Sequence, residues 1–159
     1  MNLSQKQCDF VLNSKFCIVA TSDASNQPRA CVVMPEMAFD DKVIIADCQM
    51  GKTRENILQN PKVFLSFYDN DLEWCMKCDA RAEYISDAEN NRGGGSFSEI
   101  FVPNWNNKVC RLPELSSQLS NQSTSTKKIL SAIKTVQQQK GYSVAGLVSC
   151  TITSAEMCQ

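Results

Sequence analysis

The pattern of hydrophobic and polar positions predicts a protein built mainly from β-strands. Apolar residues alternate with polar ones, or form short apolar runs bounded by turn residues, in six segments. These segments predict strands at residues 16–21, 29–39, 42–47, 62–69, 71–86 and 143–157. The strands follow one another without a helix between each pair. This order predicts a mainly β fold, an antiparallel barrel or sandwich with helices at its ends, in a single domain of residues 1–159.

Helical spacing of apolar residues occurs in only a few places. Ser4 and Gln7 have the spacing of a capping box and predict a helix at the start of the chain. A short helix is predicted after Thr53 and ends at Pro61, because proline cannot continue it. A third helix is predicted over residues 126–139. The helices are too few to alternate with the strands.

Two short features shape the second and third predicted strands: one connects them and the other interrupts the second. Asp40 and Asp41 form a tight connection between residues 29–39 and 42–47, which is typical of an antiparallel hairpin. Pro35 interrupts the strand at 29–39. Since proline cannot donate to a ladder of hydrogen bonds, it predicts an edge, a bulge or an opening of the sheet.

The composition changes at about residues 87–126, where serine, asparagine, glycine and glutamine dominate. A segment of this length predicts an irregular insert, a lid or a mobile loop. Phe101 and Trp105 lie inside it, and could either stack on a ligand or pack within the insert.

Charge and cysteine content narrow the environment and the partners. The chain has 16 basic and 17 acidic residues, so no nucleic-acid partner or anionic membrane surface is expected. No apolar stretch approaches the roughly 20 residues of a membrane span. Nine cysteines without an export signal predict reduced thiols in the cytoplasm.

The titratable residues limit the possible chemistry. Histidine is absent, which removes the commonest general base and zinc ligand, so a reaction would depend on other groups or on a cofactor. Cys75 and Cys78 have the spacing of a metal or redox pair, but on a strand they face opposite sides of the sheet. No metal site is therefore expected.

The stretch ADCQMGKT (residues 46–53) allows three interpretations. Gly51-Lys52-Thr53 between a strand and a helix is typical of an ATP- or GTP-binding loop, but Ala46 replaces the first glycine of that motif. A helix start can also bind another phosphate through its unpaired amides, helped by the Lys52 cation. In the third interpretation Thr53 only caps the helix and Lys52 is solvated.

The ordered set of motifs from FCIVATSD through MGKTRENILQNP to CDARAEY resembles the pyridoxamine 5'-phosphate oxidase-like FMN-binding split-barrel family. The similarity covers about residues 3 to 86 and, more weakly, the last strand at 143–157, and it is greatest to the small single-domain members, including bacterial FMN-binding protein. It implies a six-stranded antiparallel split barrel and a homodimer, with FMN at the subunit interface. The Trp- and Arg-rich C-terminal segment of the vitamin B6 oxidase itself is missing, so pyridoxamine phosphate is not the expected substrate.

The resemblance also implies which residues hold the cofactor. Lys52 and Thr53 match the residues that hold the FMN phosphate, and Asn56 matches the family's asparagine, which could instead tie the turn together. The strand whose backbone lies along the isoalloxazine matches Val33, Met34 and Pro35. The segment before the phosphate turn matches Ala46, Asp47, Cys48 and Gln49.

The function implied is that of an FMN-binding flavoprotein, either an oxidoreductase or a flavin-based electron carrier, with no catalytic side chain assigned. A protein that stores or senses FMN without turnover is the alternative from the binding class. A domain that binds ATP or GTP through Gly51-Lys52-Thr53 is a further alternative.

Overall fold

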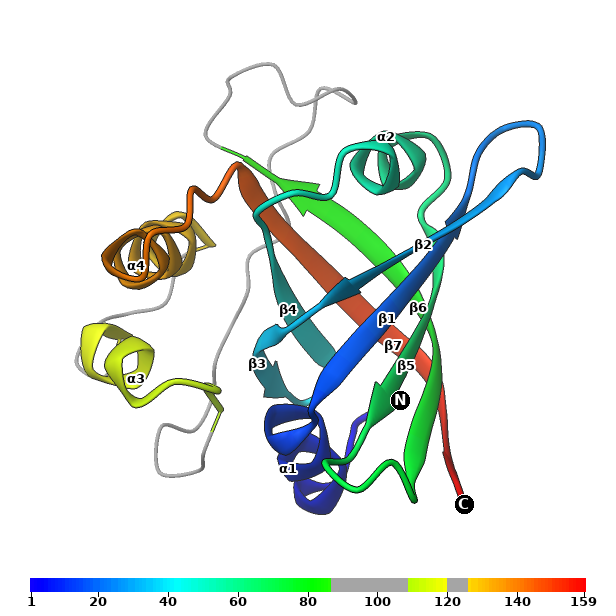
Figure 1. The fold of residues 1–159 in the computed structure, drawn as a ribbon, viewed down its shortest axis with the longest axis horizontal. Helices are drawn as coiled ribbons and strands as arrows, with labels where there is room; N and C mark the ends of the chain where they lie inside the picture. Colours follow the sequence, from blue (N-terminus) through cyan, green and yellow to red (C-terminus); the bar gives the residue numbers. More distant parts are fainter. Residues whose placement is uncertain (87–108, 120–125) are drawn as a thin grey trace.

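The computed structural model describes residues 1–86, 109–119 and 126–159, and one curved antiparallel sheet dominates it (Figure 1). The order of its strands is β2-β1-β5-β6-β7-β4-β3, and every neighbouring pair is antiparallel. The strands are β1 (Phe16–Ser22), β2 (Pro28–Val33), β3 (Pro35–Phe39), β4 (Lys42–Asp47), β5 (Lys62–Tyr68), β6 (Cys75–Ile85) and β7 (Gly146–Cys158). The predicted mainly β, antiparallel fold is confirmed.

The described residues form seven strands, so the prediction of six is not confirmed. The difference is at Met34, which belongs to neither β2 nor β3. Pro35 lacks the N–H that would continue the β2 ladder, and the chain crosses there from one edge of the sheet to the other. The two edge strands are thus joined by a single residue, which closes the curved sheet into a half-barrel (Figure 1).

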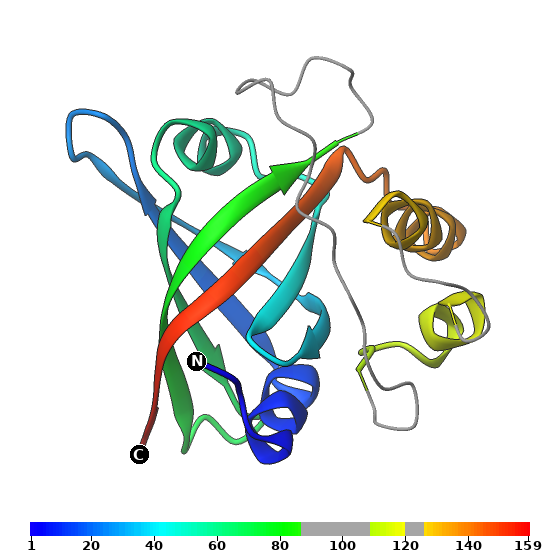
Figure 2. The same ribbon diagram turned by 180° about the vertical axis from the view of Figure 1, so that it is seen from behind.

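Alternation along the strands separates a packed interior from an outer face. On β6, Met76, Cys78 and Ala80 are buried, whereas Lys77 and Asp79 between them are exposed. Side chains from β1, β5, β6 and β7 fill the interior, and the long strands β6 and β7 run side by side across the back (Figure 2). The predicted separation of the CxxC cysteines onto opposite faces follows from the same alternation.

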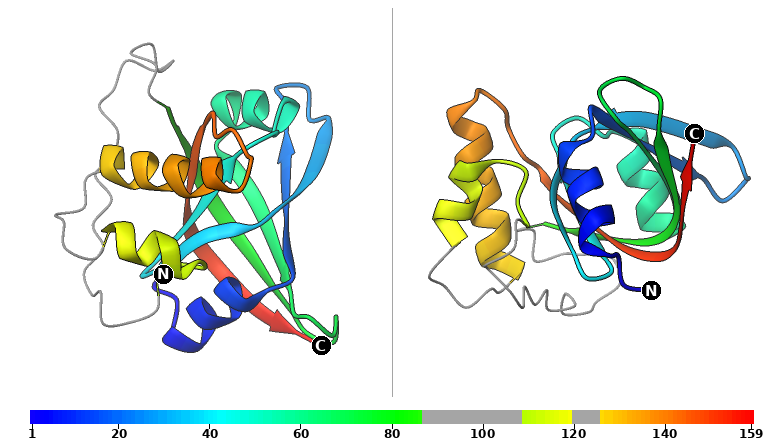
Figure 3. Two further views of the ribbon diagram at one scale, coloured as in Figure 1. Left: turned by 60° about the vertical axis from the view of Figure 1, so that its left-hand side comes forward. Right: turned by 90° about the horizontal axis from the view of Figure 1, so that it is seen from below.

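Helices α1 (Gln5–Asn13) and α2 (Lys52–Gln59) lie at opposite ends of the half-barrel (Figure 3). The predicted capping box of α1 is present. The Gln7 backbone N–H donates to Ser4 Oγ at 3.2 Å, and the Ser4 N–H donates to Gln7 Oε1 at 2.8 Å. Val11 and Leu12 are buried and join α1 to the interior core.

Helices α3 (Pro113–Leu119) and α4 (Thr126–Gln139) lie together against the outer side of β3 and β4 (Figure 1). Their apolar faces form a second core with that side of the sheet. The bounds of α4 agree with the prediction. Helix α3 falls inside the predicted irregular insert, so that prediction was wrong for residues 113–119. Residues 87–108 and 120–125 of the insert, with Phe101 and Trp105, lie outside the described residues.

The chain before α3 covers the edge of β3. Ala38 N–H donates to the Val109 carbonyl at 2.9 Å, and Arg111 N–H donates to the Glu36 carbonyl at 2.8 Å. These bonds satisfy backbone groups of an edge strand that would otherwise be open to other chains. They also hold Arg111 beside the place where β2 ends.

Two further observations concern the environment of the protein. All nine cysteines fall within the described residues and carry free thiols. Over the ranges that the structure describes, none of the helices combines the length and apolar character needed to span a membrane.

Candidate functional site

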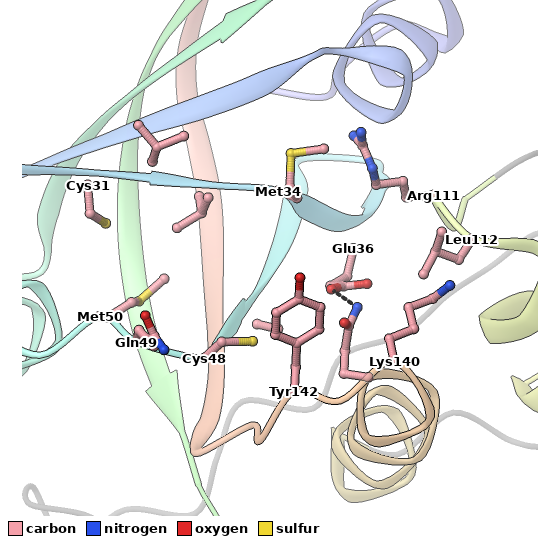
Figure 4. Close-up of a pocket in the computed structure, with 14 residues that line it drawn as sticks. Cys31, Met34, Glu36, Cys48, Gln49, Met50, Arg111, Leu112, Lys140 and Tyr142 are labelled. Atoms are coloured by element: carbon pink, nitrogen blue, oxygen red, sulfur yellow. Dashed lines mark hydrogen bonds between the residues drawn. The ribbon is translucent and has the colours of Figure 1, made fainter.

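A cavity of about 470 Å³ opens where β2 ends, between the turn that joins β4 to α2 and the end of α4 (Figure 4). Its volume lies within the range of about 300–1,000 Å³ that is usual for small-molecule sites. The lining residues are Cys31, Val32, Val33, Met34, Glu36, Ala46, Cys48, Gln49, Met50, Arg111, Leu112, Gln137, Lys140 and Tyr142.

Half of the predicted cofactor-binding residues line this one cavity. They are Val33, Met34, Ala46, Cys48 and Gln49. The register of the sheet explains why two separate segments meet, because Pro35 pairs with Ile45 and so places the start of β3 beside the end of β4. Met34 lies outside both ladders, which leaves its backbone groups free of strand pairing at the cavity wall.

Asp47 does not line the cavity, and its carboxylate is held by other protein groups. Oδ1 accepts the Met50 backbone N–H at 2.9 Å, and Oδ2 accepts the Tyr84 hydroxyl at 2.6 Å. Arg54 Nε lies 3.5 Å from Oδ2, and the Asp47 side chain is only 1% exposed. Asp47 therefore positions the turn before α2. Its predicted contact with a cofactor is indirect in this geometry.

The first turn of α2 has the features of an anion site. Gly51 is the N-cap with a φ of 50°, a left-handed conformation that favours glycine, and no side chain caps the helix. The Thr53 N–H already donates to the Met50 carbonyl at 3.0 Å, so it is the other amides of the first turn that can point at a bound anion, and the helix dipole favours negative charge there. Lys52 is half exposed at this end and pairs with Glu55 at 3.1 Å.

Thr53 and Asn56 are buried residues of α2, and neither lines the cavity. The interpretation of Thr53 as a helix cap is wrong, because α2 begins at Lys52 and Thr53 is buried in its first turn. Burial raises the pKa of the Cys31 thiol, and the Thr53 side chain beside it lowers that pKa. Asn56 Nδ2 donates to Thr21 Oγ1 at 3.1 Å and ties α2 to β1.

Pro35 is also buried away from the cavity, and begins a β-bulge that re-aims the next side chain. The register between β3 and β4 shifts between Pro35 and Met37, so Glu36 is the extra residue. Glu36 is 5% exposed and lines the cavity wall opposite Cys48 and Gln49 (Figure 4). A single acidic residue beside a proline in an otherwise apolar strand was the signal in the sequence that could have identified it.

The Glu36 carboxyl has an unusual environment. Gln137 Nε2, from α4, donates to Glu36 Oε1 at 2.6 Å. Burial raises the pKa of Glu36 from 4.5 to about 7, although the Gln137 hydrogen bond and the charges of Arg111 and Lys140 lower it. Removing water disfavours the ionised carboxylate more than these neighbours favour it.

The C-terminal end of α4 supplies the third wall of the cavity. Tyr142 N–H donates to the Gln137 carbonyl and Gly141 N–H to the Gln138 carbonyl, each at 3.0 Å. With Gly141 at a φ of 87°, these bonds form a Schellman motif, which ends the helix and turns the chain sharply. Lys140 and Tyr142 flank the glycine, and the Tyr142 ring projects into the cavity (Figure 4).

Arg111 joins this wall to α1. Its Nη1 donates to the carbonyl oxygens of Leu12 at 3.2 Å and Ser14 at 3.0 Å. These carbonyls belong to the end of α1, where helix carbonyls lack partners within the helix. The motifs around residues 33–53 contain no information on Arg111, Lys140 or Tyr142, because the packing of α3 and α4 on the sheet brings them to the cavity.

Comparisons with known proteins agree with this fold. The family model described as pyridoxamine 5'-phosphate oxidase matches residues 3–109, which is more than half of the chain. The chain therefore belongs to the pyridoxamine 5'-phosphate oxidase family, as its motifs predicted. A search of curated proteins gave no match to the sequence.

Several solved structures share the fold at low sequence identity. HupZ of Group A Streptococcus is 18% identical with a TM-score of 0.63, over 99% of this chain and 94% of that one. A putative pyridoxamine 5'-phosphate oxidase of Lactobacillus delbrueckii is 16% identical with a TM-score of 0.58, over 98% and 93%. An FMN-binding protein of Syntrophomonas wolfei is 12% identical with a TM-score of 0.53, over 96% and 83%.

Proposed function

We propose that this protein binds FMN in the cavity between β2, the β4–α2 turn and α4, and acts as a flavin-dependent oxidoreductase or electron carrier in the cytoplasm. The observation that carries the proposal is the meeting at one cavity of the predicted ring-side strand (Val33 and Met34) and the segment before the phosphate turn (Ala46, Cys48 and Gln49), beside the uncapped start of α2. Membership of the family and the FMN-binding relative of Syntrophomonas wolfei support the same cofactor.

The residues at the site suit the parts of FMN. The start of α2 carries the partial positive charge of the helix dipole, and the half-exposed Lys52 adds a full positive charge beside it. Both charges favour binding of a phosphate at this end of the helix. The Met34 backbone, free of strand pairing, and the walls made by Val33 and Ala46 suit the edge and face of a flat ring. Bound FMN would supply the redox chemistry, while the protein orients it and limits access of water.

We further propose that the protein is a homodimer and that the second copy covers the mouth of the cavity. Val32 on the edge strand β2 lines the cavity and is 67% exposed, and it belongs to a group of apolar side chains on one face, which favours coverage by a partner. Ile18 pairs with Val32 across the strands, and Phe64, 38% exposed, extends the apolar face onto β5.

The strand arrangement argues against the ATP or GTP alternative. Loops that wrap the phosphates of these nucleotides follow a strand of a parallel sheet, whereas β4 is antiparallel to both β3 and β7. FMN storage or sensing without turnover uses the same site, so turnover is the distinction. Oxidation of NADH or NADPH by the FMN-loaded protein would support an enzyme, and FMN binding without turnover would support storage or sensing.

Substitution of Lys52 tests the phosphate end of the site. We expect Lys52→Ala to weaken FMN binding about 5- to 150-fold, equivalent to the roughly 1–3 kcal/mol of a charge-assisted hydrogen bond. Titration of the protein into FMN, followed by flavin fluorescence, gives the dissociation constants. Riboflavin lacks the phosphate, so its affinity should change much less.

Lys6→Ala provides the matched control, because Lys6 lies on α1 at the opposite end of the half-barrel. Equal FMN affinity of the Lys52→Ala and Lys6→Ala proteins would show that Lys52 does not hold the phosphate. Failure of the wild-type protein to bind FMN at all would overturn the proposed function.

A further inference from the structure

Glu36 lines the cavity, and the proposed function assigns no role to its carboxyl group. Glu36 is the one carboxylic acid among the described residues that line it. Acidic side chains are rarely this deeply buried without a cationic partner or several hydrogen bonds. Among the described residues, the Glu36 carboxyl has one side-chain hydrogen bond, from the neutral amide of Gln137.

Only one oxygen of the Glu36 carboxyl accepts a hydrogen bond from a described side chain, and the residue lines the cavity. The β-bulge at Glu36 directs the side chain outward from the barrel interior, and Gln137 holds Oε1 from the α4 side. Figure 4 shows the Glu36 carboxyl among the side chains that line the cavity, with Met34 and Tyr142 on the same side of it. A ligand in the cavity would therefore displace water from this carboxyl.

Charged and titratable groups surround Glu36 from each element packed around it. Arg111 and Cys110 come from the chain before α3, Lys140 from the end of α4, and Cys48 from the β4–α2 turn. The two cations lower the pKa of Glu36, and the Glu36 charge helps to raise the pKa of both thiols. Tyr142, from the turn after α4, completes the surroundings (Figure 4).

Arg111 is a weak counter-ion for Glu36 because its guanidinium also donates to two α1 carbonyls. Lys140 forms no ion pair with Glu36 among the described residues. The carboxyl therefore depends on water for much of the stability of its ionised form. Burial raises its pKa to about 7, so both forms are populated near neutral pH.

We propose that Glu36 takes up a proton when the cavity is filled, so that FMN binding is coupled to protonation of this carboxyl. Displacement of the remaining water disfavours the carboxylate, whereas the protonated acid can donate a hydrogen bond to an acceptor atom of the ligand. The coupling rests on the proposed function, because it requires FMN to occupy this cavity. Its consequence is an FMN affinity that falls as the pH rises above 7.

Isothermal titration calorimetry of FMN binding tests the proposal with the wild-type and Glu36→Gln proteins between pH 6 and 9. Glutamine keeps the shape and accepts the Gln137 hydrogen bond but cannot titrate. Measurements at pH 7.5 in two buffers of different ionisation enthalpy give the number of protons taken up. The FMN phosphate also titrates, with a pKa near 6, but equally in both proteins.

We expect the wild-type protein to take up more protons than Glu36→Gln, and its dissociation constant to rise by up to tenfold per pH unit above pH 7 relative to the variant. Equal proton counts and parallel pH profiles would overturn the coupling while leaving FMN binding intact. Absence of FMN binding by the wild-type protein would instead overturn the proposed function, and this inference with it.

Gln137→Leu provides a second variant, which retains the titrating Glu36. It removes a hydrogen bond that lowers the pKa of Glu36, so the fall in FMN affinity should begin at a higher pH than in the wild-type protein. An unchanged onset in a folded Gln137→Leu protein would contradict the assignment of the proton to Glu36.

Discussion

At the scale of single residues, two buried carboxyls near the cavity have opposite environments. Asp47 accepts hydrogen bonds from a backbone N–H and a tyrosine hydroxyl and lies near Arg54, so its charge is compensated. Glu36 has one neutral amide donor. Burial with few donors raises the pKa of a carboxyl, as it does for Glu36. Asp47 is therefore suited to a structural role and Glu36 to proton exchange.

The raised pKa of Glu36 predicts a pH-dependent stability. The folded state binds this proton more tightly than the unfolded state, whose pKa is near 4.5. The stabilising contribution is thus complete below pH 4.5 and is lost as the pH rises through about 7. The shift corresponds to at most about 3 kcal/mol.

Urea unfolding of the wild-type and Glu36→Gln proteins at several pH values checks this prediction. We expect the wild-type free energy of unfolding to fall, relative to the variant, between pH 4.5 and 8 and to level off above that. Other carboxyls titrate equally in the two proteins and cancel in the difference. A difference that is constant with pH would show that Glu36 has an ordinary pKa in the folded protein.

At the scale of elements, the sequence predicted most strands and helices because their local signals agree with their packing. The bounds of β4 and α4 agree with the prediction, since each has a clear apolar pattern and a turn at its end. The break at Met34 was predicted only as an interruption, because the crossing between sheet edges depends on pairing with distant strands. Helix α3 was missed although Pro113 and Glu114 suit a helix start.

The candidate site was predictable to a similar extent. The segments around Met34 and Cys48 lie in contiguous motifs, so their meeting at the cavity follows from one hairpin. Lys140 and Tyr142 reach the cavity only because the Schellman motif ends α4 at that place, and Arg111 because its backbone pairs with β3. These placements depend on long-range packing, which periodicity and spacing do not encode.

Gly146 shows how an element boundary supports the site. It begins β7 opposite Asp47, and a Cβ added there would lie 2.5 Å from the Ile85 carbonyl oxygen and 2.7 Å from the Tyr84 hydroxyl. We expect Gly146→Ala to lower the free energy of unfolding by about 1–3 kcal/mol, because a methyl group forced into packed atoms displaces backbone and side chain. The Tyr84 bond to Asp47 would be strained by the same displacement.

Chemical denaturation measures this effect, with Ser143→Ala as the control, because Ser143 is exposed in the turn just before β7. Equal stability of the Gly146→Ala and Ser143→Ala proteins would mean that the sheet yields at this position without cost. Weaker FMN binding by Gly146→Ala is expected as well, since Asp47 positions the turn that leads into α2.

At the scale of the whole molecule, the half-barrel has one covered and one uncovered apolar face. Helices α3 and α4 bury the outer side of β3 and β4. The outer side of β1, β2 and β5 presents Ile18, Val32 and Phe64 without such a cover from the described residues. Because Val32 also lines the cavity, a partner on this face would complete the candidate site. The proposed dimer therefore connects assembly to cofactor binding.

A charge placed on this face tests that connection. We expect the wild-type protein to have twice the chain mass by light scattering, and Val32→Asp to weaken the dimer at least about a hundredfold, because an unpaired carboxylate buried in an interface costs several kcal/mol.

Leu72→Asp is the matched control: Leu72 is 55% exposed in the turn between β5 and β6, away from the cavity, and its φ of 58° suits aspartate. The monomeric Val32→Asp protein should also bind FMN more weakly, if the second copy covers the cavity mouth. A Val32→Asp protein that remains dimeric would exclude this face as the interface, and a wild-type protein that is monomeric would overturn the dimer and place the FMN site within one chain.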